Sequence, residues 1–243
     1  MNLSGKTVVI TGASRGLGAG IARELAGHGL NLGLCARQPP VLGDGERVVA
    51  AELDVTDGPA VAAFAARVAA RFEHIDLWIN NAGVLEPIGP LRDLDPPAVA
   101  RHIDVNVMGV FHGSQAYVRH VRASGRPGVL VNISSGAGRA PYHGWSAYCA
   151  AKAAVDRITE CIALEEKDAG LRAHSVAPGV IDTDMQALIR RQSAEQFPEV
   201  ERFRQMKRDS AFITPDVVAN RLLALAFDPA AHRDDVSIDL RGD

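Results

Sequence analysis

Seven short apolar segments alternate with longer amphipathic segments along the chain. The apolar segments are typical of buried strands, and they cover Thr7–Ile10, Leu30–Cys35, Arg47–Leu53, Leu77–Ile79, Val129–Ile133, Leu171–Val176 and Val236–Leu240. Helical patterns cover Ala60–Arg71, Ala98–Val121, Ala147–Glu166 and Asp216–Ala226. Strands separated by helices pair in parallel through right-handed crossovers. Strands that are apolar throughout indicate helices on both faces of the sheet. The alternation therefore predicts a doubly wound parallel α/β sheet of the Rossmann type.

Composition places the whole chain, residues 1–243, in one domain. Of its residues, 47% are hydrophobic, which suits one large core, and no repeat or linker divides it. The net charge of -3 gives no basic field, so we expect no nucleic-acid or membrane partner. An odd number of cysteines, three, without metal spacing predicts reduced thiols in the cytoplasm. Because Lys6–Ile10 already has the pattern of a strand, we expect no secretory signal.

Two segments depart from the regular alternation. Gln38–Glu46 contains two prolines and two glycines, so we expect a turn or a single helical turn in place of a crossover helix. Met185–Arg208 is polar and follows a Pro-Gly turn. It predicts either a mobile lid over a site or a plain pair of surface helices, and the pattern favours neither.

A glycine-rich turn connects the first strand to the first helix. It has the sequence Thr11-Gly-Ala-Ser-Arg-Gly-Leu-Gly18. Glycines let the backbone turn tightly and approach a pyrophosphate at the N-terminus of a helix. This placement favours dinucleotide binding over an ordinary turn. The residues expected to contact the cofactor here are Gly12, Ser14, Arg15, Gly16, Leu17 and Gly18.

The end of the second strand indicates which dinucleotide is bound. Sites that prefer NAD usually place an acidic residue there, for the ribose hydroxyl. Here Ala36 takes that position, and Arg37 follows it. Arg15 and Arg37 are suited to clamp a 2′-phosphate, so we expect NADP(H). The alternative is that one or both arginines are solvated surface charges.

Two further segments are candidates for the cofactor site. Asp54, with Val55 beside it, ends the third strand and could accept from the adenine amino group. Its alternative role is a helix cap, for which Asp57 is the better candidate. Asn81, Ala82 and Gly83 follow the fourth strand, where small residues let the chain pass close to a ribose. Asparagines also stabilise loops that bind nothing.

Tyr148 and Lys152 form the candidate catalytic pair. Residues four apart share one helix face, and an adjacent ammonium favours the phenolate of a tyrosine. Ser135 ends the fifth strand, at the edge where open α/β sheets bind ligands, so its hydroxyl could hold a substrate oxygen beside Tyr148. Taken alone, a Tyr/Lys pair at this spacing is more often a surface contact.

These motifs together resemble the short-chain dehydrogenase/reductase family over essentially the whole chain. Tyr148-Cys-Ala-Ala-Lys152 is similar to the family's Tyr-x-x-x-Lys pattern, and the family serine, thirteen positions earlier, falls on Ser135, with Ser134 as a structural neighbour. Asn106 matches the family asparagine, which the resemblance implies bends a helix and holds a relay water. The resemblance also implies a nicotinamide-side motif made of Pro178, Gly179, Ile181 and Thr183.

The resemblance implies a hydride transfer between NADPH and a carbonyl carbon. Tyr148 would protonate the oxygen, Ser135 would stabilise it, and Lys152 would lower the pKa of Tyr148 and bind the ribose. Asn106 would relay the proton. A dehydrogenase of secondary alcohols, a lyase or epimerase, and a non-catalytic dinucleotide-binding regulator are the alternatives. The helices at Ala98–Val121 and Ala147–Glu166 resemble those of the family's dimer contact, so a homodimer or homotetramer is expected.

Local strings narrow the expected substrate. Asn80–Ile88, Trp145–Tyr148 and Ala177–Gln186 resemble the benzil reductase branch, which is related to sepiapterin reductase. This implies a vicinal diketone that is reduced to a hydroxyketone. Leu85, Tyr142, Trp145 and Met185 would line a pocket for an aryl ketone, or they could simply pack in the core. His143 could hydrogen-bond a substrate, although the pattern favours a partly exposed loop residue. The histidines lack metal-binding spacing, so no catalytic metal is expected.

Overall fold

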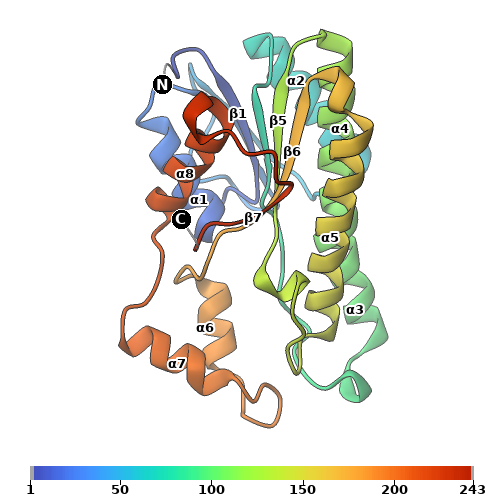
Figure 1. The fold of residues 1–243 in the computed structure, drawn as a ribbon, viewed down its shortest axis with the longest axis vertical. Helices are drawn as coiled ribbons and strands as arrows, with labels where there is room; N and C mark the ends of the chain where they lie inside the picture. Colours follow the sequence, from blue (N-terminus) through green and yellow to red (C-terminus); the bar gives the residue numbers. More distant parts are fainter. Residues whose placement is uncertain (1–2, 242–243) are drawn as a thin grey trace.

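The computed structural model describes residues 3–241, and its centre is a seven-stranded parallel sheet (Figure 1). The strand order is β3-β2-β1-β4-β5-β6-β7. All seven expected strands are present, within one or two residues at each end, so the predicted doubly wound Rossmann sheet is confirmed. Their bounds are β1 Thr7–Thr11, β2 Asn31–Ala36, β3 Val48–Glu52, β4 Leu77–Asn80, β5 Gly128–Ile133, β6 Leu171–Ala177 and β7 Ser237–Asp239.

Helices cover both faces of the sheet (Figure 1). One apolar cluster joins the sheet to α1 and α8 through residues such as Ile21 and Leu222. A second cluster joins the opposite face to α2 and α4 through residues such as Phe64 and Tyr117. The helix bounds are α1 Gly16–Ala26, α2 Gly58–Phe72, α3 Pro96–Ile103, α4 Gly109–Ser124, α5 Ser146–Glu165, α6 Asp184–Arg190, α7 Val200–Arg208 and α8 Pro215–Phe227. Short 3-10 turns occur at Leu91–Asp93, Gly136–Gly138, Lys167–Ala169 and Pro229–Ala231.

The order of the strands reverses at β1, which pairs with β2 on one side and β4 on the other. Open α/β sheets bind ligands outside the carboxyl ends of the strands at such a switch point. The glycine-rich turn follows β1 and the Asn81–Gly83 segment follows β4, so both lie at this position. The fold therefore places the candidate cofactor motifs where the strand order creates a crevice.

The long helix expected over Ala98–Val121 is interrupted, and this expectation is corrected. A π-helical turn, Asp104–Met108, separates α3 from α4. Asn106 lies in this turn and is buried. Its side-chain amide donates to the carbonyl of His102, one turn earlier, at 3.1 Å. Insertions of this kind loosen the regular hydrogen-bond ladder, and they are frequent at functional sites.

The two irregular segments take different forms. Residues 38–46 form bends and one isolated bridge, between Gly45 and Val48, so the expected turn is confirmed. Met185–Arg208 contains α6 and α7 with a connection between them (Figure 1). This agrees with the expected pair of helices, whereas mobility of the segment stays a prediction.

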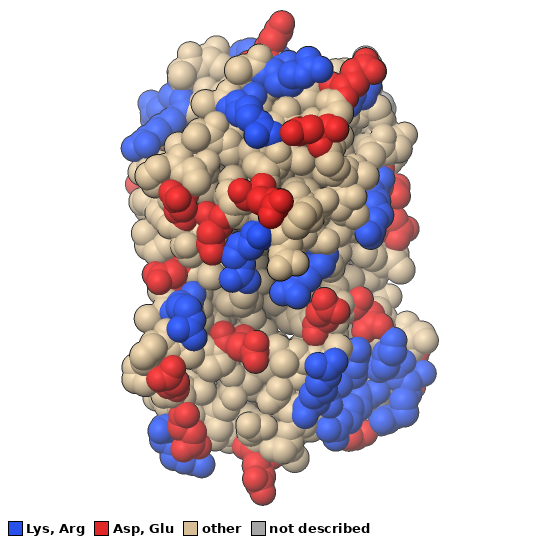
Figure 2. All heavy atoms as spheres, turned by 180° about the vertical axis from the view of Figure 1, so that it is seen from behind, with Lys and Arg blue, Asp and Glu red and all other residues tan. Residues whose placement is uncertain are grey.

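Basic side chains gather at the α6–α7 end of the molecule when it is seen from behind (Figure 2). The last turn of α7 carries two of the basic residues of this chain, Lys207 and Arg208.

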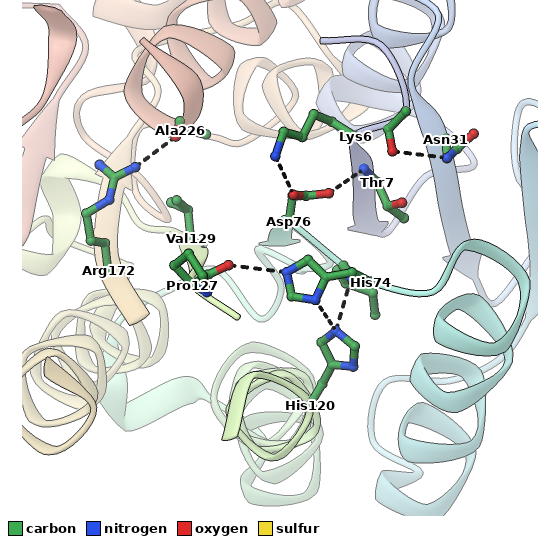
Figure 3. A network of polar contacts seen from close by, with 12 residues as sticks. Lys6, Thr7, Asn31, His74, Asp76, His120, Pro127, Val129, Arg172 and Ala226 are labelled. Carbon is green, nitrogen blue, oxygen red and sulfur yellow. Dashed lines mark hydrogen bonds and ion pairs between the residues drawn. The ribbon is translucent and has the colours of Figure 1, made fainter. Parts of the chain in front are cut away.

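The amino-terminal edge of the sheet is closed by a polar network (Figure 3). The carboxylate of Asp76 accepts from the Lys6 ammonium at 2.8 Å and from the Thr7 backbone N–H at 2.9 Å. The imidazole of His120 accepts from the Ile75 N–H and lies 3.1 Å from the ring nitrogen of His74. These contacts join β1, β4 and α4, so they fix the strands at the end opposite the candidate site.

Residues 3–241 contain neither a helix suited to span a membrane nor a cluster suited to hold a metal. In this range no helix has the length and hydropathy needed to cross a bilayer. Within the same described residues, no group of three or more His, Cys, Asp or Glu side chains could hold a metal ion. The absence of a catalytic metal stays a prediction. All three cysteines, Cys35, Cys149 and Cys161, are free thiols.

Candidate functional site

The glycine-rich turn packs directly against the segment after β4. Gly12 has φ +72°, and a Cβ there would lie 2.8 Å from the Cα of Ala82. The Thr11 hydroxyl accepts from the backbone N–H groups of Asn81, at 3.0 Å, and Ala82, at 3.1 Å. The Asn81 amide donates back to the Thr11 carbonyl at 2.9 Å. Glycine is required at position 12 because the backbone of Ala82 leaves no space for a Cβ. The Asn81 side chain links the two loops through its hydrogen bond to Thr11.

The N-terminus of α1 is open to an anion. Arg15 occupies the cap position without a side-chain hydrogen bond to the helix, and the first turn contains no acidic residue. The first backbone N–H groups of a helix have no partner within the helix and carry its positive end. Gly16 and Gly18 add no side chains of their own at this end of the helix. This cradle fits the diphosphate of a dinucleotide. Ser14, Arg15, Gly16 and Leu17 are all at least partly exposed there.

The two candidate phosphate-binding arginines are exposed. The Arg15 guanidinium lies 3.8 Å from the Asp184 carboxylate, and both side chains are mostly in solvent. Arg37 is exposed directly after β2. Their positions, in the glycine turn and at the end of the neighbouring strand, place both at the same edge of the sheet. Asp184 therefore competes with any phosphate for Arg15, although an exposed pair at this separation is weak.

Asp54 and Asp57 have different partners. The Asp54 carboxylate accepts from the backbone N–H and the hydroxyl of Thr56, both at 3.0 Å. Asp57 caps α2 by accepting from the N–H of Ala60 at 3.0 Å, as expected. Val55 is buried, and its carbonyl lies 3.0 Å from a ring nitrogen of His112. Asp54 thus shapes the loop after β3 and does not cap the helix.

The side chains of Ser135, Tyr148 and Lys152 come together at the carboxyl end of β5. Ser135 follows the strand, and its hydroxyl accepts from the Ala137 N–H at 3.2 Å and acts to lower the pKa of the Tyr148 phenol. The Lys152 ammonium donates to the carbonyl of Ile133 at 2.8 Å and lies 5.6 Å from the centroid of the Tyr148 ring. Helix α5 presents the tyrosine and the lysine on one face.

Burial dominates the protonation of this pair. It raises the pKa of Tyr148 to about 12, and the hydrogen bond with Ser135 only partly opposes the shift. The lowering of this pKa by Lys152 stays a prediction, since the net shift is set by burial. Burial lowers the pKa of Lys152 to about 8, against the attraction of Asp156. The phenol is a stable proton donor at neutral pH, and the ammonium titrates close to the physiological range.

Asn106 holds the segment after β4 from the other side. Its amide donates to the Val84 carbonyl at 2.9 Å, and its side-chain oxygen accepts from the Val84 N–H at 3.1 Å. A Cβ on Gly83 would lie 2.8 Å from that oxygen. The π-helical turn, Gly83 and Asn106 therefore form one packed unit next to α5.

The segment after β6 faces the glycine turn. Pro178 and Ile181 are buried, and Gly179 has φ +86° with a virtual Cβ only 2.4 Å from Ile213. Thr183 precedes α6, and its side chain makes no capping hydrogen bond to the helix. A Cβ on Gly16 would lie 3.5 Å from the Thr183 methyl group. A pocket of about 370 Å³ lies between the two segments, lined by Gly16, Asp182, Thr183, Asp184, Ala187 and Arg190.

An aromatic cluster connects the α6–α7 segment to Tyr148. Trp145 stacks on Phe197 with ring centroids 4.6 Å apart, and it contacts Tyr148 edge-on at 5.5 Å. Leu85 and Trp145 are buried in this cluster, whereas Tyr142 and Met185 pack at its margin. His143 is exposed, as expected. Phe197 and the buried His102 beside Tyr148 were not anticipated from the sequence. The one available signal for His102 is its position one helical turn before Asn106.

A doubly wound sheet, a glycine cradle at the switch point and a buried Ser-Tyr-Lys group define the class of Rossmann-fold oxidoreductases. Residues 6–194 match the family model described as short chain dehydrogenase. The chain belongs to that family.

The relatives of stated function act on different substrates. The chain is 33% identical over 224 residues to a benzil reductase ((S)-benzoin forming) of Bacillus subtilis (strain 168), covering 89% of this chain and 91% of that one. It is 34% identical to 3beta-hydroxysteroid dehydrogenase 1 of Eggerthella lenta, covering 76% and 74%. The structure of carveol dehydrogenase from Mycobacterium avium in complex with NAD matches with a TM-score of 0.83 at 26% identity. The match covers 98% of this chain and 97% of that one.

Proposed function

We propose that this protein is an NADPH-dependent carbonyl reductase. The observation that carries the proposal is the convergence of Ser135, Tyr148 and Lys152 beside the glycine cradle. Retention of all three groups argues against a non-catalytic regulator, because a dinucleotide sensor needs no proton donor. A lyase or epimerase would consume no NADPH.

The proton chemistry follows from the environment of each group. The nicotinamide ring, when bound, supplies the hydride. Tyr148, kept protonated by burial, donates its proton to the oxygen of the substrate carbonyl. The Ser135 hydroxyl acts on that phenol to lower its pKa, and it would stabilise the same substrate oxygen by a hydrogen bond. Lys152 places a positive charge where the phenolate forms, and Asn106 holds the segment after β4 in place.

The cofactor would span the carboxyl edge of β1, β4 and β6. Its diphosphate fits the cradle of Gly12, Ser14, Gly16, Leu17 and Gly18. We assign the 2′-phosphate to Arg15 and Arg37. Asp54 and Val55 would flank the adenine, whereas Asn81, Ala82 and Gly83 would lie along a ribose. Tyr148 and Lys152 would reach the second ribose, with Pro178, Gly179, Ile181 and Thr183 at the nicotinamide.

A vicinal diketone such as benzil is the proposed substrate class. Support comes from the benzil reductase relative, whose sequence aligns along most of this chain. It also comes from the apolar surroundings of Tyr148, which Trp145 contacts edge-on, because an apolar site suits an aryl ketone. The hydroxysteroid dehydrogenase relative favours a second candidate, oxidation of a cyclic secondary alcohol.

Mixing the protein with benzil and either cofactor tests the proposal. We expect rapid loss of NADPH absorbance, accumulation of benzoin, and a kcat/KM for NADPH at least about tenfold above that for NADH, since one bidentate phosphate contact is worth about that factor. Absence of turnover with both cofactors would refute the diketone substrate, and a screen of secondary alcohols with NADP+ would then test the second candidate.

The cofactor preference has a matched control. Arg37→Ala should raise the KM for NADPH with little change for NADH. Arg23→Ala removes an equally exposed arginine from the last turn of α1 and should change neither value. Equal effects of the two substitutions would remove Arg37 from the phosphate site.

We also propose a homodimer or homotetramer formed through α4 and α5. Phe111 on α4 is 42% exposed and Leu164 on α5 is 81% exposed, which is unusual for large apolar side chains. Light scattering should give a mass of at least two chains, and the double variant Phe111→Asp/Leu164→Asp should lower it. A monomeric wild type would contradict this assembly. A cytoplasmic location stays a prediction from cysteine usage.

A further inference from the structure

A buried histidine lies beside the proton-transfer pair without a role in the chemistry above. His102, on α3, is 1% exposed. Its ring meets the Tyr148 ring edge-on, with centroids 6.1 Å apart and an interplanar angle of 79°. Histidine is mostly kept partly in solvent, so complete burial against a catalytic tyrosine calls for a physical reason.

One hydrogen bond fixes the tautomer of His102. Its Nδ1 lies 2.8 Å from the carbonyl oxygen of Glu86, which can only accept. Nδ1 therefore carries the proton, and Nε2 presents a lone pair. Nε2 is buried, and no protein group in the described part of the chain donates to it. A buried acceptor without a donor is costly, so natural proteins commonly satisfy it with an internal water.

Burial, with help from the charge of Lys152, favours the neutral form of His102. Burial lowers its pKa, and so does the ammonium of Lys152 on α5, whereas the hydrogen bond to Glu86 opposes the shift. The phenol of Tyr148, the other titratable group packed against it, stays protonated. His102 is thus an uncharged acceptor beside a buried cation.

His102 also connects the π-helical turn around Asn106 to the segment after β4. Its carbonyl accepts from the Asn106 amide, and its ring holds the carbonyl of Glu86 in the segment after β4. An ammonium has three donors, and Lys152 uses one on Ile133. A water that donates to Nε2 would lie near the phenol of Tyr148, whose ring meets that of His102, and near the charged Lys152.

We propose that His102 is a positioning residue of the Tyr148/Lys152 pair, and that its Nε2 accepts a hydrogen bond from an internal water that solvates this pair. The proposal rests on the proposed reductase function. Protonation of the imidazole would replace the acceptor by a donor and place a second positive charge beside Lys152. The reductase is therefore active with neutral His102 and loses activity as the pH falls through the pKa of His102.

Two isosteric substitutions separate the roles of the two ring nitrogens. His102→Gln can place an amide oxygen near Nε2, whereas His102→Asn can replace only the Nδ1–H donor to Glu86. We expect Asn to lower kcat roughly tenfold, the factor expected from one lost buried hydrogen bond, and Gln to retain most of kcat. The fall in kcat at acidic pH should disappear in the Gln variant. Full activity of Asn with an impaired Gln variant, or wild-type profiles in both, would overturn the proposal.

A readout without substrate separates this proposal from the reductase function. Imidazole nitrogen NMR of the full-length protein should show His102 as the neutral Nδ1–H tautomer at pH 7. It should also show a higher His102 pKa in Lys152→Met, because the neighbouring charge is gone. An imidazolium at pH 7, or an unchanged pKa in Lys152→Met, would overturn the role given to His102. Failure of carbonyl reduction with the expected NMR result would instead refute the proposed function alone.

Discussion

Replacing Tyr148 by Phe is expected to lower kcat for carbonyl reduction by roughly 10²–10⁴-fold, the range that one general acid contributes. The substitution removes only a hydroxyl, and the ring keeps its contacts with Trp145 and His102. The glycine cradle on α1 is untouched, so the affinity for NADPH, measured by fluorescence titration, should change by less than about threefold. Activity is measured as NADPH loss with benzil.

Tyr142→Phe is the matched control for this substitution. It removes the same hydroxyl from a ring that packs 5.1 Å from Trp145 at the margin of the same cluster. We expect its kcat to stay within a few-fold of the wild type. If Tyr148→Phe kept wild-type activity, another group would have to be the proton donor and the proposed mechanism would be wrong.

The fold could be predicted from the sequence because strand and helix patterns report burial directly. Val8, Val9 and Ile10 in β1 are wholly buried, as continuous apolar runs indicate. The π-helical turn around Asn106 was not predictable from periodicity, because one added residue in a helix barely changes the apolar pattern. Its cause is tertiary, since Asn106 turns inward to hold Val84.

The candidate site was only partly accessible to the same reasoning. Motif spacing predicts that Ser135, Tyr148 and Lys152 share one site, and the structure places the Lys152 ammonium 5.6 Å from the centre of the Tyr148 ring, with Ser135 acting on the Tyr148 pKa. Spacing carries no information on desolvation, so the raised pKa of Tyr148 and the lowered pKa of Lys152 were not anticipated. Phe197 was missed for a related reason. It comes from a polar segment, and only the packing of that segment onto Trp145 shows its role.

Replacing Lys152 by Met is expected to lower kcat by roughly 10²-fold, since a positioned charge at a developing anion is worth about that factor. Met has nearly the same length and fits the same buried space without the ammonium. The hydrogen bond to Ile133 is lost, but so is the cost of burying a charge. The melting temperature, measured by calorimetry, should therefore be no lower than that of the wild type, which separates loss of function from loss of fold.

The pH profile distinguishes Lys152 from Tyr148 as the source of the alkaline decline. Lys152 is active as the ammonium, and burial lowers its pKa to about 8, so kcat for reduction should fall as the pH rises through that value. This decline is separate from the acidic fall in kcat that is assigned to His102. Tyr148, with a pKa raised to about 12, stays protonated over the same range and cannot produce this decline. In Lys152→Met the small remaining activity should show no decline near pH 8. Lys167→Met, which removes an exposed lysine, should keep the wild-type profile. An alkaline decline that persists near pH 8 in Lys152→Met would assign it to another group and remove the charge of Lys152 from the mechanism.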